Sequence, residues 1–223
     1  MLDDASHYRA LAAAYARGAL DRLALDDDAA IAEGLAAGLR LHRFKRSFPR
    51  TPGEALHGLP RVKRVLGVLR GLGVARLLDV GSGRGAFLWP LVDAMPEVEV
   101  TAIDLLPHRV LAIEHVRRGG IERVSAARMD ATALGLGAKS VDAVTLLEVL
   151  EHMPDPAPAA AEAVRVARTA VVATVPSHED DNPEHLRVYD GDALTALLRD
   201  AGARRVTIDH VRGHLVAVAM VDA

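Results

Sequence analysis

The 223-residue chain contains no cysteine. Disulfide bonds, zinc–thiolate sites and thiol nucleophiles are therefore excluded together. Aromatic residues make up only 3% of the chain, and three of them are phenylalanines. Few side chains are thus available to stack on unpaired bases, which is the common way in which proteins recognise single-stranded RNA.

Long apolar stretches are missing as well. The sequence has no run of about 18 uncharged apolar residues, which a transmembrane helix would need. It begins Met1-Leu2-Asp3-Asp4, which is acidic where a secretory signal would be basic and then apolar. We therefore expect a cytoplasmic protein with no membrane partner.

Acidic residues are scarce between residues 40 and 76, although the net charge of the chain is −3. Glu54 is the only acid of this stretch. Its basic residues are Arg40, Arg43, Lys45, Arg46, Arg50, Arg61, Lys63, Arg64, Arg70 and Arg76. Such a block suggests an anionic partner, but it equally fits a solvated helix face in a chain rich in alanine and arginine.

Two kinds of hydrophobic pattern divide the chain at about residue 74. Before this point apolar residues recur at helical spacing, and the acids Asp26-Asp27-Asp28 separate two expected helices. Pro60 opens a third helix, which Gly71 and Gly73 end. We expect residues 1–74 to form a helical segment and residues 75–223 to form a separate domain.

After residue 75 short apolar runs alternate with helical stretches, which is typical of a parallel sheet with helices on both faces. Strands are expected at 76–80, 98–103, 124–129, 141–147 and 170–175, with helices such as 87–95 and 159–166. A helix at 192–201 precedes two final strands, 204–211 and 214–221, which the turn Arg212-Gly213 joins. The pattern predicts a Rossmann-like α/β fold whose last two strands close the sheet antiparallel.

A glycine-rich turn follows the first expected strand, in Leu77-Leu78-Asp79-Val80-Gly81-Ser82-Gly83-Arg84-Gly85. Glycines allow the backbone to turn tightly and to approach a ligand beside the N-terminus of the next helix. The spacing Gly81-x-Gly83-x-x-Ala86 also fits a dinucleotide-binding fingerprint, so this element alone does not decide the ligand.

Two aspartates end the next strands. Asp104 ends the second strand, where an acid can accept hydrogen bonds from both hydroxyls of a ribose. Asp130 follows the third strand, where a carboxylate can receive an adenine amino group. Each aspartate could instead only cap a turn.

Taken together, these elements resemble the class I S-adenosylmethionine (SAM)-dependent methyltransferases from about Leu77 to Val221. The glycine loop, the two aspartates, the strand 141–147 and the closing hairpin follow the order and spacing of that family. The resemblance implies a seven-stranded, mostly parallel sheet, a SAM cofactor and an N-terminal segment that covers the cofactor pocket. It also implies that the amino-acid part of SAM contacts the loop, that the ribose contacts Asp104 and that the adenine contacts Asp130. The residues expected to bind SAM are Asp79, Gly81, Ser82, Gly83, Gly85, Asp104, Leu105, Asp130, Ala131 and Leu147.

The fourth strand ends in a group of ionisable residues, Glu148, Glu151 and His152. If Glu148 begins a helical turn, the other two share its face. His185 follows the fifth strand at the same edge of the sheet, so the four residues could bind Mg²⁺ or Mn²⁺. Glu-x-x-Glu-His resembles both the ubiquinone-pathway O-methyltransferases and the small-RNA 3′-terminal ribose 2′-O-methyltransferases, and in the latter two glutamates and two histidines bind a metal.

A site without a metal stays open, because acids at a helix start are favoured without any ligand. Methyl transfer to oxygen requires alignment and a deprotonated hydroxyl. A metal would lower the hydroxyl pKa directly, and otherwise His152 is the candidate general base, with Glu148 beside it. We expect His178, His210 and His214 to be surface or hairpin residues.

The expected function is methyl transfer from SAM to a hydroxyl of a small molecule. Methylation of an RNA 3′-terminal ribose is the first alternative, supported by the basic block with Phe44 and Phe48. An NAD(P)-dependent oxidoreductase is the second alternative, and a non-catalytic SAM-binding or RNA-binding module is the third. The sequence does not indicate an oligomeric state.

Overall fold

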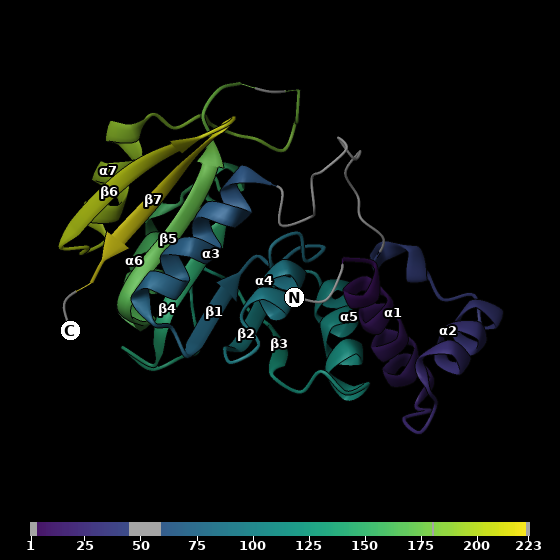
Figure 1. The fold of residues 1–223 in the computed structure, drawn as a ribbon. Coiled ribbons are helices and arrows are strands. Elements are labelled where there is room, and N and C mark those ends of the chain that lie inside the picture. Colours follow the sequence, from purple (N-terminus) through teal and green to yellow (C-terminus); the bar gives the residue numbers. More distant parts are fainter. Residues whose placement is uncertain (1–3, 45–58, 180, 222–223) are drawn as a thin grey trace.

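The computed structural model describes residues 4–44, 59–179 and 181–221 and contains one seven-stranded sheet (Figure 1). The strand order is β3-β2-β1-β4-β5-β7-β6. The strands are β1 (Arg76–Val80), β2 (Glu99–Asp104), β3 (Val124–Arg128), β4 (Val141–Leu147), β5 (Ala167–Pro176), β6 (Arg205–Val211) and β7 (His214–Met220).

Strands β1 to β5 pair in parallel, and β7 runs antiparallel between β5 and β6. This arrangement confirms the predicted fold, including the closing hairpin. The register of β7 on β5 pairs His214 with Pro176. The first residue of β7 therefore lies at the edge of the sheet where the parallel strands end.

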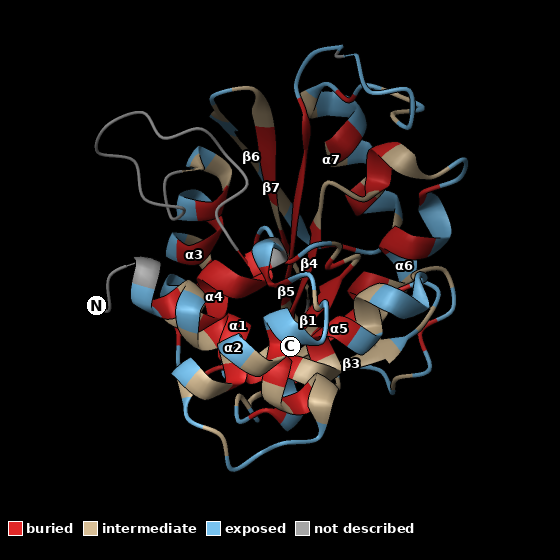
Figure 2. Ribbon diagram, turned by 90° about the vertical axis from the view of Figure 1, so that its right-hand side faces the viewer, coloured by how far each residue is buried: buried red, intermediate tan, exposed pale blue. Residues whose placement is uncertain are grey.

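Helices cover both faces of the sheet. They are α1 (Asp4–Leu20), α2 (Asp27–Ala36), α3 (Pro60–Leu72), α4 (Leu88–Ala94), α5 (Pro107–Arg118), α6 (Ala157–Val166) and α7 (Gly191–Asp200). One core cluster joins α1, α3, α4 and α5 to one face, and a second joins α6 and α7 to the other. Buried residues accordingly concentrate in the strands and in the helix faces turned toward them (Figure 2). None of the described helices combines the length and hydropathy needed to cross a bilayer.

The three helices expected before residue 74 are present, and Asp26 caps α2 by accepting a hydrogen bond from the Ala29 amide at 2.8 Å. Helix α1 packs against α5, and α2 packs against α1. Among the described residues of this segment, only Arg61 and Val62 of α3 line the ligand pocket. The division at residue 74 and the covering role stay predictions. Lys45, Arg46, Phe48 and Arg50 of the basic block lie outside the described residues.

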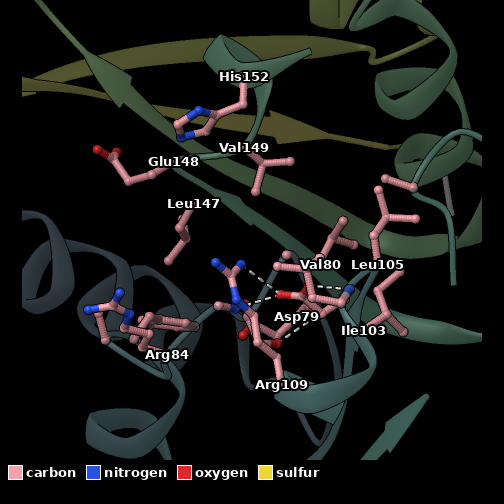
Figure 3. Close-up of a pocket in the computed structure, with 18 of the residues that line it drawn as sticks. Asp79, Val80, Arg84, Ile103, Leu105, Arg109, Leu147, Glu148, Val149 and His152 are labelled. Carbon is pink, nitrogen blue, oxygen red and sulfur yellow. Dashed lines mark hydrogen bonds and ion pairs between the residues drawn. The ribbon is translucent and has the colours of Figure 1, made fainter. Parts of the chain in front are cut away.

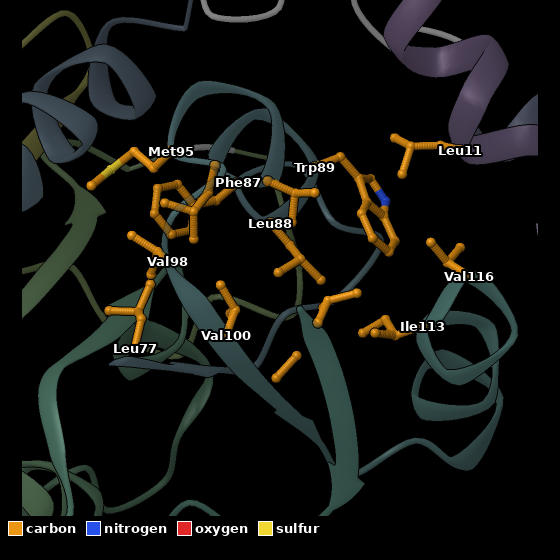
Figure 4. Close-up of a cluster of buried hydrophobic side chains, with 14 of the residues drawn as sticks. Leu11, Leu77, Phe87, Leu88, Trp89, Met95, Val98, Val100, Ile113 and Val116 are labelled. Carbon is orange, nitrogen blue, oxygen red and sulfur yellow. The ribbon is translucent and has the colours of Figure 1, made fainter. Parts of the chain in front are cut away.

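Helices α1 and α5 approach so closely that glycines are required at their contact. A Cβ atom on Gly18 would lie 1.9 Å from the carbonyl oxygen of His115, and one on Gly119 would lie 1.7 Å from that of Ala14. Trp89 of α4 lies in the same core cluster as Leu11 of α1 and Val116 of α5 (Figure 4). This contact attaches the N-terminal helix to the helices that cover the sheet.

Candidate functional site

A cavity of about 630 Å³ lies at the carboxyl ends of β1, β2 and β4. The strand order reverses between β1 and β4, and open α/β sheets bind their ligands at such a switch point. The cavity lining includes most of the predicted cofactor residues, namely Asp79, Gly81, Ser82, Gly83, Asp104, Leu105, Asp130, Ala131 and Leu147. In Figure 3, Asp79 and Arg109 lie at one end of this pocket, and Glu148 and His152 lie at the other.

The glycine loop has two different structural roles. Gly81 lines the pocket with φ +68°, and a Cβ there would lie 2.7 Å from Cγ2 of Val149. Gly85 is not among the lining residues, and a Cβ on it would lie 2.1 Å from Nε1 of Trp89. Gly81 therefore shapes the ligand site, whereas Gly85 allows Trp89 to pack behind it.

Asp79 is a buried acid without a full set of partners. Its Oδ1 accepts a hydrogen bond from the Thr145 hydroxyl at 2.7 Å, but its Oδ2 has no hydrogen-bond partner among the described residues. Burial, with a smaller contribution from the nearby Asp104, raises the pKa of Asp79 to about 6 against the opposing effects of Ser82 and Thr145. A buried carboxylate of this kind is suited to pair with a cationic ligand group.

The carboxylate of Asp104 accepts hydrogen bonds from two backbone amides and from an arginine side chain. Its Oδ2 accepts hydrogen bonds from the Gly83 amide at 3.0 Å and from Nη1 of Arg109 at 3.3 Å. Its Oδ1 accepts a hydrogen bond from the Leu106 amide at 2.9 Å. The glycine loop and the end of β2 are thus joined through one carboxylate that lines the pocket.

Asp130 lies at the mouth of the pocket. Its Oδ1 accepts hydrogen bonds from the amide and the hydroxyl of Thr132, at 2.9 and 2.8 Å. These bonds lower the pKa of Asp130 below its ordinary value. The residue therefore caps a turn and also lines the pocket, so the two predicted roles are compatible.

Glu148 does not begin a helical turn. Its φ of +58° places it in the left-handed region, and the short helix η3 spans Leu150–His152. The expectation that Glu148 shares a helical face with Glu151 and His152 is therefore wrong. The positive φ redirects the chain at the end of β4 and turns the Glu148 side chain toward other partners.

The carboxylate of Glu148 joins three elements that are distant in the sequence. Oε1 accepts a hydrogen bond from the Thr174 hydroxyl of β5 at 2.7 Å, and Nε of Arg61 in α3 lies 4.0 Å from it. Oε2 lies 3.0 Å from Nε2 of His214 in β7. Burial acts to raise the pKa of Glu148, but His214, Arg61 and Thr174 outweigh it and hold the pKa below its ordinary value. Glu148 is thus suited to orient its neighbours and is a poor acceptor of protons.

The other three predicted metal ligands lie together. Ligand atoms of Glu151, His152 and His185 all lie within 4.8 Å of one another. Glu151 is fully buried, and the rings of His152 and His185 meet edge to face at 4.7 Å between centroids. Of the four residues proposed from the sequence, the structure therefore groups three and separates Glu148.

His152 has a defined orientation. Its Nδ1 lies 2.9 Å from the carbonyl oxygen of Glu184, which can only accept a hydrogen bond. Nδ1 therefore carries the hydrogen, and Nε2 is left as the basic nitrogen of the ring. His152 also lines the pocket, as a group that removes a proton from an acceptor must.

Sequence reasoning missed Arg61, Arg109 and His214. Arg61 was counted only as part of the basic block, and His214 was expected to be a simple hairpin residue, yet both contact Glu148. The antiparallel pairing of β7 on β5 was the one signal for His214, because it places the start of β7 beside the end of β5. No local motif marks Arg61 or Arg109.

A methyltransferase domain family matches residues 78–173. A ubiquinone biosynthesis O-methyltransferase from Xanthomonas axonopodis pv. citri (strain 306) is 41% identical over 113 residues, which are 47% of this chain and 44% of that protein. Another from Methylocella silvestris is 37% identical over 101 residues, covering 45% of this chain and 37% of that protein. The chain therefore spans less than half the length of these relatives.

Solved structures match over a larger part of the chain. A SAM-dependent methyltransferase from Aquifex aeolicus is similar with a TM-score of 0.58 and 25% identity, over 74% of this chain and 96% of that chain. The N-terminal domain of EvdMO1 with S-adenosylhomocysteine (SAH) bound gives a TM-score of 0.59 at 20% identity, over 74% of this chain and 84% of that one, which shows the fold alone. The sheet, the pocket at its switch point and these similarities together support a class I SAM-dependent methyltransferase domain in this chain.

Proposed function

We propose that this protein transfers the methyl group of SAM to a hydroxyl oxygen of a small molecule. The observation that carries the proposal is the pocket at the switch point, which has acids suited to SAM at one end and His152 at the other. The relatives named ubiquinone biosynthesis O-methyltransferases support oxygen as the atom that is methylated.

The lining residues fit the parts of SAM. The unpartnered Oδ2 of Asp79 suits the ammonium group of the methionine part, and Arg84 offers positive charge for its carboxylate. Asp104 would receive the ribose hydroxyls, and Leu105, Asp130 and Ala131 would contact the adenine. SAM would supply an electrophilic methyl group, and Glu148 and His152 lie at the end of the pocket away from Asp79.

His152 is the proposed general base. Its Nε2 accepts the proton of the acceptor hydroxyl, while the hydrogen bond from Nδ1 to Glu184 fixes the ring. Glu148 stays ionised and, with Arg61 and His214, holds the wall of the site in place. We therefore assign Glu148 a positioning role rather than that of a second base.

A metal-assisted variant of this mechanism rests on the grouping of Glu151, His152 and His185. One carboxylate and two imidazoles could hold a divalent cation, and Mg²⁺ and Mn²⁺ are the ions to test. Such an ion would lower the pKa of the acceptor hydroxyl. His152 would then be a ligand, so the metal and the general base are competing roles for one residue.

Charge pairing in α3 favours a small molecule over RNA as the acceptor. Arg64 lies 2.5 Å from the carboxylate of Asp209, Arg61 pairs with Glu148, and Arg70 donates a hydrogen bond to the carbonyl of Ala94. These basic residues already have partners within the protein, so they are less available to bind phosphates. The acceptor itself could be identified by screening hydroxylated aromatic compounds with SAM.

The cofactor assignment is tested by calorimetry with SAH and NAD. We expect SAH to bind in the micromolar range or better and NAD not to bind appreciably. Asp104→Ala should weaken SAH binding by about 1.5–3 kcal/mol, the usual loss for hydrogen bonds to a charged group. Asp200→Ala, at an exposed aspartate of α7 outside the pocket, is the control and should bind SAH normally. Tighter binding of NAD than of SAH would overturn the proposal.

The raised pKa of Asp79 predicts a pH dependence of cofactor binding. The pKa of Asp79 is about 6 in the folded protein, compared with an ordinary value of 3.8. Its contribution to the free energy of unfolding is therefore fully present below pH 3.8 and is lost as the pH rises through about 6. Its ionised form thus destabilises the ligand-free protein but pairs with the ammonium group of the ligand. SAH affinity should therefore fall by up to about tenfold per pH unit below pH 6.

Asp79→Asn separates this effect from other titrations. The variant should bind SAH more weakly at pH 8 and lack the steep loss between pH 7 and pH 5. Its free energy of unfolding at pH 8, without ligand, should exceed that of the wild type by on the order of 1–3 kcal/mol. Calorimetry and denaturant unfolding measure the two effects. Equal pH profiles for variant and wild type would contradict the assignment of Asp79.

A further inference from the structure

The ion pair between Arg109 and Asp104 lies inside the pocket. Arg109 is on α5, lines the pocket and has a side chain that is 34% exposed, whereas that of Asp104 is 5% exposed. In Figure 3 the Arg109 side chain lies beside Asp79 at the end of the pocket away from His152. The guanidinium thus occupies space next to the carboxylate that is proposed to receive the ribose.

The acceptor sites of Asp104 can be counted. An ionised carboxylate offers about two hydrogen-bond acceptor sites on each oxygen. Both sites of Oδ2 are filled, by the Gly83 amide and by Arg109, and one site of Oδ1 is filled by the Leu106 amide. A ribose that donates one hydroxyl to each oxygen would find a free site on Oδ1 and none on Oδ2.

Of the three donors, only Arg109 can leave without unfolding the loop. The Gly83 and Leu106 amides belong to the glycine turn and to the chain that leads from β2 into α5, so their positions are set by the backbone. Arg109 has a long side chain that reaches solvent. A partly exposed pair of this kind contributes up to about 1 kcal/mol, which the binding of a nucleoside can offset.

We propose that Arg109 is an internal occupant of the ribose subsite, which binds Asp104 in the ligand-free protein and is displaced when a nucleoside with two ribose hydroxyls binds. Arg109 thereby lowers the affinity for the cofactor and for its product alike, which favours release of SAH after each turnover. This inference rests on the proposed function, because it takes the ligand of Asp104 to be a ribose.

The test compares Arg109→Met with the wild type by calorimetry, using adenosine, SAH and 2′,3′-dideoxyadenosine as ligands. Methionine keeps an unbranched side chain similar to the aliphatic part of arginine, and it lacks the guanidinium and therefore every hydrogen-bond donor. The variant should bind adenosine and SAH about two- to fivefold more tightly. Its affinity for 2′,3′-dideoxyadenosine should be unchanged, because that ligand has no hydroxyl to compete with Arg109.

Arg117→Met is the matched control, since Arg117 is also on α5 and pairs with Glu114 outside the pocket. It should bind all three ligands like the wild type. Weaker binding of adenosine by Arg109→Met, or an equal gain for the dideoxy compound, would overturn the displacement proposal while leaving the methyltransferase assignment in place. Failure of the wild type to bind SAH would instead overturn the proposed function, and this inference with it.

Discussion

Replacing His152 by alanine is expected to lower kcat by about 10²–10⁴-fold, which is the usual contribution of a general base. The reason is that His152 lines the pocket and that the hydrogen bond between its Nδ1 and the Glu184 carbonyl leaves Nε2 as the basic nitrogen of the ring. SAH affinity, measured by calorimetry, should stay nearly unchanged, because the residues that fit SAM lie toward the other end of the pocket (Figure 3).

The control for this variant is His178→Ala. His178 is exposed on the loop that follows β5, where it contacts Ser177 at 3.3 Å, and its loss should leave kcat within about twofold of the wild type. A kcat within tenfold of the wild type for His152→Ala would refute the role of His152 in the reaction. Loss of SAH binding together with activity would assign His152 to cofactor binding instead.

Chelation separates the two roles that are open to His152. If a cation is held by Glu151, His152 and His185, chelator treatment should abolish activity, and Mn²⁺ or Mg²⁺ should restore it. Glu151→Gln should then lose activity as well. Full activity after chelation, together with a blank metal analysis of the pure protein, would refute the metal site and leave His152 as a simple base.

Replacing Gly119 by alanine should strongly lower the free energy of unfolding. The new Cβ would lie 1.7 Å from the carbonyl oxygen of Ala14, and a backbone atom cannot rotate away as a side chain can. Overpacking of this kind costs about 1–3 kcal/mol. In a chain of this size the loss corresponds to a melting temperature lower by roughly 2–12 °C, which calorimetry or circular dichroism can measure.

Gly67→Ala is the matched control, since Gly67 lies within α3 and, apart from its chain neighbours and the backbone of its own helix, no described atom lies within 4 Å of the position of its Cβ. It should raise the free energy of unfolding by up to about 1 kcal/mol, because alanine has a higher helix propensity than glycine. The contact between α1 and α5 would be disproved as a determinant of stability if both variants melted at the same temperature.

The sheet was predictable because its strands are short apolar runs bounded by turn residues. The predicted boundaries of 76–80 and 141–147 match β1 and β4, and the final pair closes the sheet as expected. The packing of α1 on α5 could not be predicted in the same way. It depends on the absence of side chains at Gly18 and Gly119, and a glycine in a helical pattern does not show which backbone lies against it.

The site was predictable where function follows from position along a strand. Asp79, Asp104 and the glycine loop lie where β1 and β2 end, so the parallel sheet alone brings them together. Glu148 was placed incorrectly because helical periodicity was extended into a segment in which the backbone takes a positive φ. Arg61 and His214 are added by long-range packing, which no local spacing records.

The partners of Glu148 have a consequence for how the active protein is made. A non-glycine residue with positive φ costs on the order of 1–3 kcal/mol and persists only where its surroundings hold it. Here the surroundings come from α3, β5 and β7, and β7 is synthesised after all the other strands. A growing chain that has formed β1 to β5 can bury its central sheet, yet its Glu148 still lacks His214. Catalytic competence is therefore expected to appear late in biosynthesis, when the hairpin inserts β7 between β5 and β6, and partly translated chains should be inactive.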